Sequence, residues 1–325
     1  MEQANAIELK NITKRFGEVV ANDSVDLSVK HGEILSVLGE NGSGKTTLMN
    51  MISGIYFPDE GQIFVDGEEV SICSPKDSFA LGIGMIHQHF KLVDVLTAAE
   101  NIILGLEGKS VLDMKKVVQD IQEVTERYGF ELDPNQKIYD MSVSQKQTVE
   151  IVKMLYRGAN ILILDEPTAV LTPQETEKLF TVLRNMRDQG KSIIIITHKL
   201  NEVLALSDRV SVLRKGKYIG TVETKNATAE SLTEMMVGEK IDLNIERPDP
   251  VNPVKRLVIE NLSCVNKEGV KTLKNASMEA YGGEILGIAG IAGSGQKELL
   301  EAVAGLQMTE SGSVRYITED GEEKE

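Results

Sequence analysis

The chain has 325 residues and a formal net charge of −15; its length predicts one large or two smaller domains. The acidic charge argues against nucleic acid as a main partner, because phosphate backbones attract basic surfaces. No apolar run approaches the ~20 residues that a membrane helix needs, and the N-terminal residues lack the pattern of a secretory signal, so we expect membrane contact only through another protein.

The first elements along the chain are two alternating strands. Residues 7–13 and 25–29 alternate apolar and polar side chains, which is typical of half-buried strands. Between them lies Phe16, some twenty residues before a glycine-rich stretch. Its ring could stack on an adenine or belong to the core, and position alone leaves both possibilities open.

The glycine-rich stretch at residues 39–46 reads G-E-N-G-S-G-K-T, a complete G-x-x-x-x-G-K-[ST] phosphate loop. It follows an apolar run at 34–38 and leads into helical spacing at 47–52, which is the order that this motif requires. Backbone N–H groups of such a loop surround a phosphate, and the helix N-terminus adds partial positive charge. We expect Lys45 to reach the β- and γ-phosphates and Thr46 to bind Mg²⁺. The predicted ATP-binding residues here are Gly39, Glu40, Asn41, Gly42, Ser43, Gly44, Lys45, Thr46 and Thr47.

The next segments predict a hairpin, a short buried strand and a helical block. Residues 61–68 read as a strand followed by an Asp66-Gly67 turn. The apolar residues 83–87 predict a strand that delivers Gln88. From about 96 to 157 the pattern is helical, and within it residues 114–128 carry one apolar face. We expect these helices to form a subdomain packed against an α/β core.

Two further apolar runs end in residues that can carry chemistry. Residues 161–164 predict a strand buried on both faces, and it ends in Asp165 and Glu166. Open α/β sheets bind ligands at the carboxyl ends of their strands, so we expect Asp165 to hold Mg²⁺ and Glu166 to polarise the attacking water. The apolar strand at 192–197 ends at His198, which we predict to contact the γ-phosphate.

The remaining pattern predicts a duplicated domain. A helix start at Thr172 and Pro173, strands at about 209–213 and 217–222, and a helix at 228–236 complete a first domain at residues 1–240. Residues 241–256, which contain three prolines, predict a linker. Residues 257–325 then repeat the beginning of the chain: 257–262 resembles 7–12, 283–286 resembles 32–35, and 290–295 resembles the phosphate loop. We expect an incomplete second copy.

Taken together, these parts resemble the ATP-binding subunit of an ABC transporter over essentially the whole chain. The resemblance implies a P-loop NTPase fold of the ABC ATPase type: an α/β mixed-sheet core, an antiparallel β subdomain and a helical subdomain. Phe16 is similar to the family's adenine-stacking aromatic residue. Gln88 is similar to its Mg²⁺-sensing glutamine and His198 to its switch histidine. The resemblance thus implies Gln88, Glu166 and His198 as catalytic residues, and Thr46, Gln88 and Asp165 as metal ligands.

The family's signature, L-S-G-G-Q, corresponds to residues 141–145, just before a helix predicted at 146–156. In the family two halves dimerise head to tail, so the resemblance implies that this segment contacts nucleotide held by another half. Ser144 replaces a glycine of the signature, and Thr172 replaces the aspartate of the D-loop at 169–172. The signature residues implied are Ser142, Val143, Ser144 and Gln145.

In the second copy, Gln296 stands at the lysine position and Lys297 at the metal-binding hydroxyl. The degenerate loop, Gly290, Gly293, Gly295, Gln296 and Lys297, is therefore expected to bind nucleotide weakly. Two ATPase halves with a weakened second loop resemble importers of simple sugars and nucleosides, and the sequence M-I-H-Q-H-F-K-L-V at 85–93 looks closer to the nucleoside branch.

The resemblance implies ATP and Mg²⁺ as cofactors and ATP hydrolysis coupled to import, weak in a chain whose second half is incomplete. Implied partners are a transmembrane permease docked on the helical subdomain, indirectly an extracytoplasmic solute-binding protein, and a second ATPase half or chain. The implied location is the cytoplasmic face of the membrane. Cys73 and Cys264 match no metal spacing and read as reduced thiols of a cytosolic protein. A soluble ABC ATPase without a transport role and an ATP-binding module without turnover remain alternatives.

Overall fold

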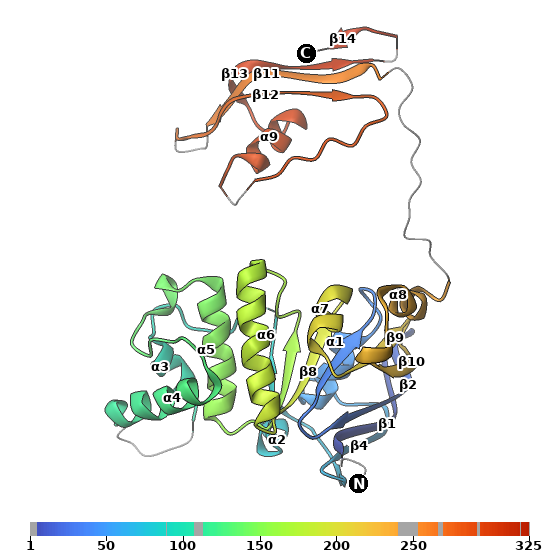
Figure 1. The fold of residues 1–325 in the computed structure, drawn as a ribbon, viewed down its shortest axis with the longest axis vertical. Helices are drawn as coiled ribbons and strands as arrows, with labels where there is room; N and C mark the ends of the chain where they lie inside the picture. Colours follow the sequence, from blue (N-terminus) through green and yellow to red (C-terminus); the bar gives the residue numbers. More distant parts are fainter. Residues whose placement is uncertain are drawn as a thin grey trace. The chain divides into compact units, whose positions relative to one another are not determined.

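The chain divides into two compact units, Met1–Leu243 and Asn244–Glu325. A computed structural model describes residues 5–88, 90–106, 113–239, 253–265, 269–290, 293–318 and 320–324 (Figure 1). Within these ranges, no helix is long and apolar enough to cross a membrane.

The core of the first unit is a six-stranded sheet in the order β10-β9-β3-β8-β7-β6. Its first five strands along the chain are parallel, and β10 adds an antiparallel edge. The central strands are buried along their whole length because helices and a second sheet cover both faces. The strands are β3 (Ile34–Leu38), β6 (Ile83–Ile86), β7 (Ile161–Asp165), β8 (Ser192–Thr197), β9 (Arg209–Arg214) and β10 (Lys217–Glu223).

A four-stranded antiparallel sheet, β2-β1-β4-β5, packs against this core. Asp66 (φ 52°) and Gly67 (φ 83°) form the two-residue turn between β4 and β5, as the Asp-Gly pair predicts. Helix α1 (Lys45–Ile52) contributes Leu48 and Met49 to the apolar core that the two sheets share. The strands are β1 (Asn5–Phe16), β2 (Val19–Lys30), β4 (Glu60–Val65) and β5 (Glu68–Val70).

Helices α5 (Val143–Tyr156) and α6 (Pro173–Asp188) pack on the six-stranded sheet. Each begins at a capping box, Ser142 with Gln145 and Thr172 with Glu175, in which side chain and backbone bond reciprocally. The capping box starts α5 three residues earlier than the sequence predicts and places the signature residues in its first turn. Helix α6 starts as predicted.

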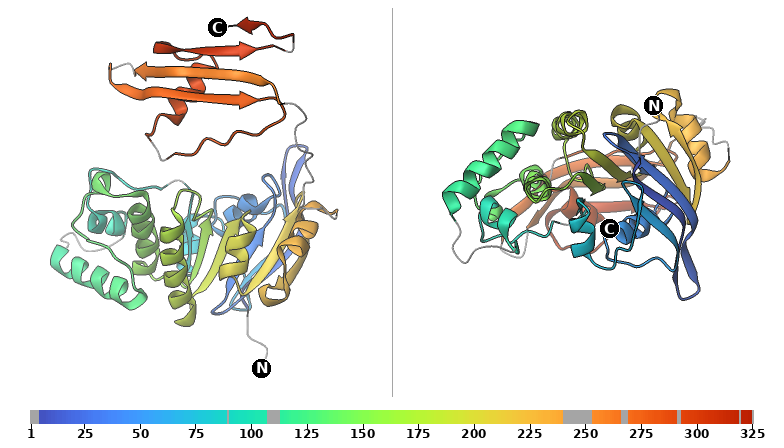
Figure 2. Two further views of the ribbon diagram at one scale, coloured as in Figure 1. Left: turned by 45° about the horizontal axis from the view of Figure 1, so that its top comes forward. Right: turned by 90° about the horizontal axis from the view of Figure 1, so that it is seen from below.

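The predicted helical subdomain consists of α3 (Ala98–Ile103), α4 (Met114–Tyr128) and α5, which share an apolar core. It lies beside the sheet, away from the edge formed by β9 and β10 (Figures 1 and 2). The bounds of α4 match the predicted amphipathic segment. The remaining helices of this unit are α2 (Pro75–Ala80), η1 (Ile138–Asp140), α7 (Leu200–Leu206), η2 (Thr224–Asn226) and α8 (Ala229–Val237).

The second unit is an antiparallel sheet, β12-β11-β13-β14, with helix α9 (Gln296–Val303) packed on it through a small core. Strand β11 begins at Lys255, so the last two residues of the predicted linker belong to the sheet, whereas most of that linker lies outside the described residues. Residues 284–290 form no strand, although their sequence resembles that of β3. The strands are β11 (Lys255–Val265), β12 (Lys271–Tyr281), β13 (Thr309–Ile317) and β14 (Glu323–Lys324).

Candidate nucleotide-binding site

The phosphate loop connects the end of β3 to the start of α1 and is closely surrounded by backbone. Gly44 caps α1 with φ 93°, a conformation that side chains disfavour. A Cβ on Gly44 would lie 2.3 Å from the carbonyl oxygen of Ala21, and a Cβ on Gly39 would lie 2.3 Å from that of Leu213. Glycine is therefore required at both ends of the loop.

Lys45 points back into this loop. Its Nζ donates hydrogen bonds to the carbonyl oxygens of Gly39 (2.7 Å) and Glu40 (2.8 Å), and only 6% of the residue is exposed. Burial lowers the pKa of Lys45, while the nearby carboxylates of Glu166 and Asp165 oppose that effect. The ammonium group is thus held inside the loop by neutral acceptors that a phosphate oxygen can replace.

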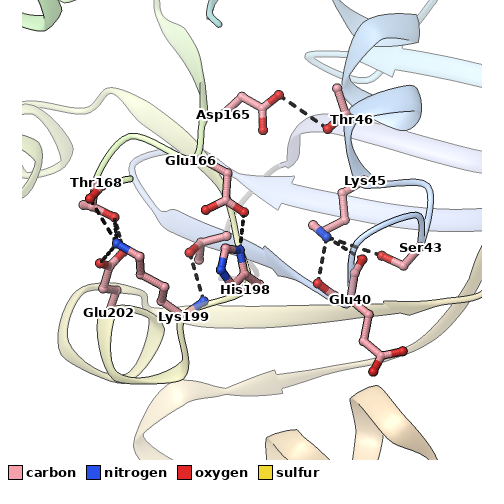
Figure 3. Close-up of polar contacts among 12 residues, drawn as sticks. Glu40, Ser43, Lys45, Thr46, Asp165, Glu166, Thr168, His198, Lys199 and Glu202 are labelled. Carbon is pink, nitrogen blue, oxygen red and sulfur yellow. Dashed lines mark hydrogen bonds and ion pairs between the residues drawn. The ribbon is translucent and has the colours of Figure 1, made fainter. Parts of the chain in front are cut away.

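Asp165 and Glu166 stand at the end of β7, opposite the loop (Figure 3). Thr46 Oγ1 donates to Asp165 Oδ2 at 3.4 Å. Burial, and then the charge of Glu166, raise the pKa of Asp165. Glu166 Oε1 lies 2.8 Å from Nδ1 of His198, whereas its Oε2 is buried with no hydrogen-bond partner among the described residues. The site therefore contains one hydrogen-bonded Glu166 oxygen and one Glu166 oxygen without a hydrogen bond among the described residues.

These groups line a single cavity of about 800 Å³. Its wall combines the phosphate loop, the strand-end residues of β6, β7 and β8, and a hairpin. The lining residues are Val19, Val20, Ala21, Asn41, Gly42, Ser43, Gly44, Lys45, Thr46, Thr47, Gln88, Asp165, Glu166, Ala169, Ile196, His198, Lys215 and Gly216. Most of the residues that the sequence predicts for phosphate, metal and water thus meet in one place.

Three predicted nucleotide contacts lie outside the wall of this cavity. Phe16 is not among its described lining residues; the ring is 43% exposed and packs edge-on against Tyr56, with 5.2 Å between ring centroids. Gly39 and Glu40 do not line the cavity either, and they contribute instead the carbonyl oxygens that hold Lys45.

Sequence reasoning missed the hairpin residues Lys215 and Gly216, which join β9 to β10. Gly216 O accepts a bond from Asp23 N (2.9 Å), and Gly216 N donates to Ser43 O (3.2 Å). A Lys-Gly pair between two predicted strands indicates the turn. No sequence pattern, however, shows that this turn folds against the phosphate loop.

The signature residues do not line this cavity. Ser142 Oγ accepts from Gln145 N (3.2 Å) and Ser142 N donates to Gln145 Oε1 (2.9 Å), which fixes the start of α5. Ser142, Ser144 and Gln145 line a separate groove of about 550 Å³ between α5 and α6, and Val143 is exposed. The structure therefore does not bring the signature segment to the cavity that Lys45 lines.

The site offers ligands suited to a hard cation. Asp165 supplies a carboxylate, Thr46 a hydroxyl and Gln88 an amide oxygen, and Mg²⁺ prefers such oxygen ligands. The described residues contain no cluster of three or more His, Cys, Asp or Glu side chains able to hold a metal. A cation here would thus be completed by phosphate and water oxygens, as Mg²⁺ usually is.

Comparison with known proteins identifies the family. A domain family described as "ABC transporter" matches residues 22–169, which include the phosphate loop, the signature and the paired carboxylates. Residues 22–169 thus form a domain of the ABC transporter family.

The curated relatives of this chain include import ATP-binding proteins. The chain is 48% identical over 322 residues to the nucleoside import ATP-binding protein NupA of Lactococcus lactis subsp. cremoris, covering 98% of this chain and 64% of the relative. It is 48% identical over 329 residues to the guanosine import ATP-binding protein NupO of Bacillus subtilis, covering 97% and 64%. The chain therefore spans slightly less than two thirds of the length of these relatives.

Solved ABC ATPases share the fold of the first unit. The ADP conformation of an ATP-binding cassette of an ABC transporter superposes with a TM-score of 0.64 at 26% identity, covering 72% of this chain and 99% of that one. This similarity confirms the predicted P-loop ABC ATPase fold.

The second unit keeps the backbone conformation of a phosphate loop but has different side chains in it. Gly293 (φ 81°) and Gly295 (φ 89°) take nearly the conformations of Gly42 and Gly44. Gln296 Nε2 donates to Ile288 O (2.9 Å), two residues before Gly290, whereas Lys45 donates to the carbonyl of Gly39, the residue that matches Gly290. Lys297 pairs with Glu301 at 3.7 Å. This loop offers neither the lysine nor the hydroxyl that the first loop presents.

Proposed function

We propose that this chain is the ATP-binding and ATP-hydrolysing part of an ABC importer, and that the imported solutes are nucleosides. The observation that carries the proposal is the single cavity in which Lys45 faces Asp165 and Glu166. The two relatives named for nucleoside and guanosine import, which match nearly the whole of this chain, support nucleosides over simple sugars.

Phosphate binding follows from the geometry of the loop. Lys45 exchanges the carbonyl oxygens of Gly39 and Glu40 for phosphate oxygens, and the resulting charge-assisted bonds are stronger than those to neutral acceptors. The N-terminus of α1 adds its partial charge. Mg²⁺ would neutralise part of the phosphate charge when bound, and Thr46, Asp165 and Gln88 are the residues that would hold it.

Hydrolysis requires a carboxylate that orients water. Glu166 meets this need because it lines the cavity and its Oε1 is held by His198. The pairing holds the carboxylate at the wall of the cavity, where it can accept a proton from a water molecule. His198 also lines the cavity and can contact the terminal phosphate.

The position of the signature supports a paired assembly. Because Ser142, Ser144 and Gln145 line a groove separate from the cavity, they act on nucleotide held by a second ATPase half or another ATPase chain. The assembly works with transmembrane permease subunits docked on the helical subdomain, at the cytoplasmic face of the membrane. An extracytoplasmic protein delivers the solute.

The first experiment separates nucleotide binding from hydrolysis. Single-turnover hydrolysis, with protein in excess over radiolabelled ATP, detects even slow chemistry. Glu166→Gln keeps the size and removes the charge, so we expect binding in a calorimetric titration to persist and the rate to fall about 100-fold or more, since the loss affects only the transition state. Normal turnover in Glu166→Gln would contradict the role of Glu166. Binding without turnover in the unmodified protein would identify an ATP-binding module.

The second experiment addresses transport. The protein is co-expressed with a candidate permease and assayed for uptake of labelled guanosine and labelled ribose. We expect guanosine uptake that Glu166→Gln abolishes. Uptake of ribose alone would assign a sugar importer, and failure to co-purify with any membrane protein would favour an ABC ATPase without a transport role.

A further inference from the structure

Beside the Glu166–His198 pair, three side chains form a closed ring of hydrogen bonds (Figure 3). Lys199 Nζ donates to Thr168 O (3.0 Å), Thr168 Oγ1 (3.1 Å) and Glu202 Oε1 (2.9 Å). Thr168 Oγ1 in turn donates to Glu202 Oε2 at 2.5 Å. We call Thr168, Lys199 and Glu202 the lysine ring.

The charged groups and the hydroxyl of the lysine ring all have hydrogen-bond partners within the ring. The ammonium group has three protons and finds three acceptors, and each carboxylate oxygen of Glu202 accepts one bond. Thr168 is 1% exposed, whereas Lys199 and Glu202 are partly buried. Fully satisfied networks of this kind rigidify the segments they join, because the loss of one member leaves the others unsatisfied.

The ring joins the two segments that carry Glu166 and His198. Thr168 lies two residues after Glu166, in the turn that follows β7, and Lys199 directly follows His198 at the start of α7. Beyond the β7–β8 ladder and the ring, the described residues join these segments through the bond of Glu166 N to Ile196 O (2.9 Å) and the Glu166–His198 contact.

The turn after β7 needs such support because its backbone is strained. Glu166 has φ 47°, a conformation that a glutamate rarely takes and that persists only where the surrounding structure imposes it. From the side of α5, the buried Gln147 holds the turn by donating to Pro167 O at 2.8 Å. The lysine ring holds it from the side of α7, one residue later.

We propose that Lys199 is a positioning residue for ATP hydrolysis: through Thr168 and Glu202 it keeps the turn of Glu166 in register with His198, and thereby orients the Glu166 carboxylate. Lys199 is not among the described residues that line the cavity, so it acts through Glu166 and His198 and not by contact with nucleotide. The proposal rests on the hydrolytic function proposed above.

The kinetic test compares rate with affinity. Lys199→Met keeps the aliphatic stem and removes the three bonds. We expect the single-turnover rate at saturating ATP to fall about tenfold, because small displacements of catalytic groups are costly, while ATP affinity stays within about twofold. Thr168→Val should have a similar effect, the double variant should be little slower than either single one, and Thr168→Ser, which keeps the hydroxyl, should retain most of the rate.

Lys191→Met provides the matched control. Lys191 is also partly buried, and its Nζ donates to a backbone carbonyl and a side chain, Ala159 O (2.8 Å) and Asn160 Oδ1 (2.8 Å). These bonds lie at the opposite ends of β7 and β8 from Glu166 and His198. We expect Lys191→Met to lower stability much as Lys199→Met does and to leave the hydrolysis rate unchanged.

A second readout requires no turnover. In nucleotide-free protein, the imidazole resonances of His198 report its pairing with Glu166, and Glu166→Gln gives their positions when the pair is changed. We expect Lys199→Met to move these resonances toward those of Glu166→Gln and Lys191→Met to leave them in place. Unmoved resonances together with a rate equal to that of Lys191→Met would overturn the proposal. If the unmodified protein does not hydrolyse ATP, the proposed function fails, and the resonances alone decide the role of Lys199.

Discussion

The two units share a sequence pattern before their glycine loops, but only the first unit forms a strand from it. Ile34, in β3, is completely buried between neighbouring strands, whereas Ile285, its counterpart in the second unit, is 82% exposed. Both follow a Gly-Glu pair and precede a leucine. The local sequence is therefore compatible with a strand in both units, but it becomes one only in the first.

Neighbouring strands account for the difference. Strand β3 pairs with β8 on one side and β9 on the other, both more than 150 residues later in the chain. The described part of the second unit contains no strand paired with residues 284–290. A strand buried on both faces depends on partners that are distant in sequence, whereas a glycine loop depends on local conformation. The second loop accordingly keeps its backbone form while lacking a sheet before it.

The largest difference is expected in stability. Ile34→Ala should lower the free energy of unfolding of the first unit by about 2–5 kcal/mol, since it leaves a cavity in a close-packed core. Ile285→Ala should change that of the second unit by less than about 0.5 kcal/mol, because the side chain is already in solvent. Urea unfolding followed by circular dichroism measures both. A comparable loss in both variants would mean that residue 285 is buried in solution.

A smaller effect, on ATP affinity, is expected when the lysine of the first loop is replaced by the glutamine found in the second. Lys45→Gln removes charge-assisted bonds to phosphate worth about 1.5–3 kcal/mol, so the affinity for Mg-ATP should fall at least about tenfold. Isothermal titration calorimetry measures this, with Gln296→Ala as the control that leaves affinity unchanged. Equal affinity for Lys45→Gln and the unmodified protein would place nucleotide elsewhere.

A further contrast concerns Asp165, a buried acid without an equivalent among the described residues of the second unit. Burial raises the pKa of Asp165, so folding favours its protonated form. The ionised form therefore costs stability at neutral pH, and this cost disappears as the pH falls toward the value for an unfolded aspartate. Asp165→Asn should stabilise the nucleotide-free protein by about 0.5–2 kcal/mol at pH 7.

Thermal unfolding of Asp165→Asn and the unmodified protein at pH 7 and at pH 4, close to the pKa of about 3.9 of an unfolded aspartate, measures this difference, which should be smaller at the lower pH. The same substitution should remove the Mg²⁺ dependence of ATP affinity. A less stable Asp165→Asn at pH 7 would show that the carboxylate is stabilised in the folded protein.

The smallest effect is expected from the reverse exchange in the second loop. Gln296→Lys restores the charge but leaves Lys297 at the position of the hydroxyl and no strand before the loop. We expect the stoichiometry of ATP binding, measured by calorimetry, to remain one per chain. A second bound nucleotide would show that the lysine alone separates the two loops.

Local patterns predicted much of the first unit. The Asp66-Gly67 turn, the amphipathic helix α4 and the Thr172 cap each depend on a few adjacent residues, and the structure has them where expected. The order of motifs also indicated that Lys45, Asp165 and His198 meet, since they follow or end buried parallel strands.

Features that depend on distant contacts were not predictable. The turn at Lys215 and Gly216 reaches the phosphate loop only because β9 lies beside β3. The lysine ring joins residues that are more than thirty positions apart. The packing of Phe16 against Tyr56 was not predictable either, and its contact with adenine stays a prediction.

The strained backbone at Glu166 has a consequence for laboratory evolution. Glycine accepts a positive φ without strain, and asparagine accepts it more easily than glutamate does. Selection for heat resistance alone should therefore enrich Glu166→Gly or Glu166→Asn, and each would discard the acid proposed to orient water. Thermotolerant libraries of this protein should be sequenced at codon 166 before their members are assayed, because the most robust clones there would be the least active.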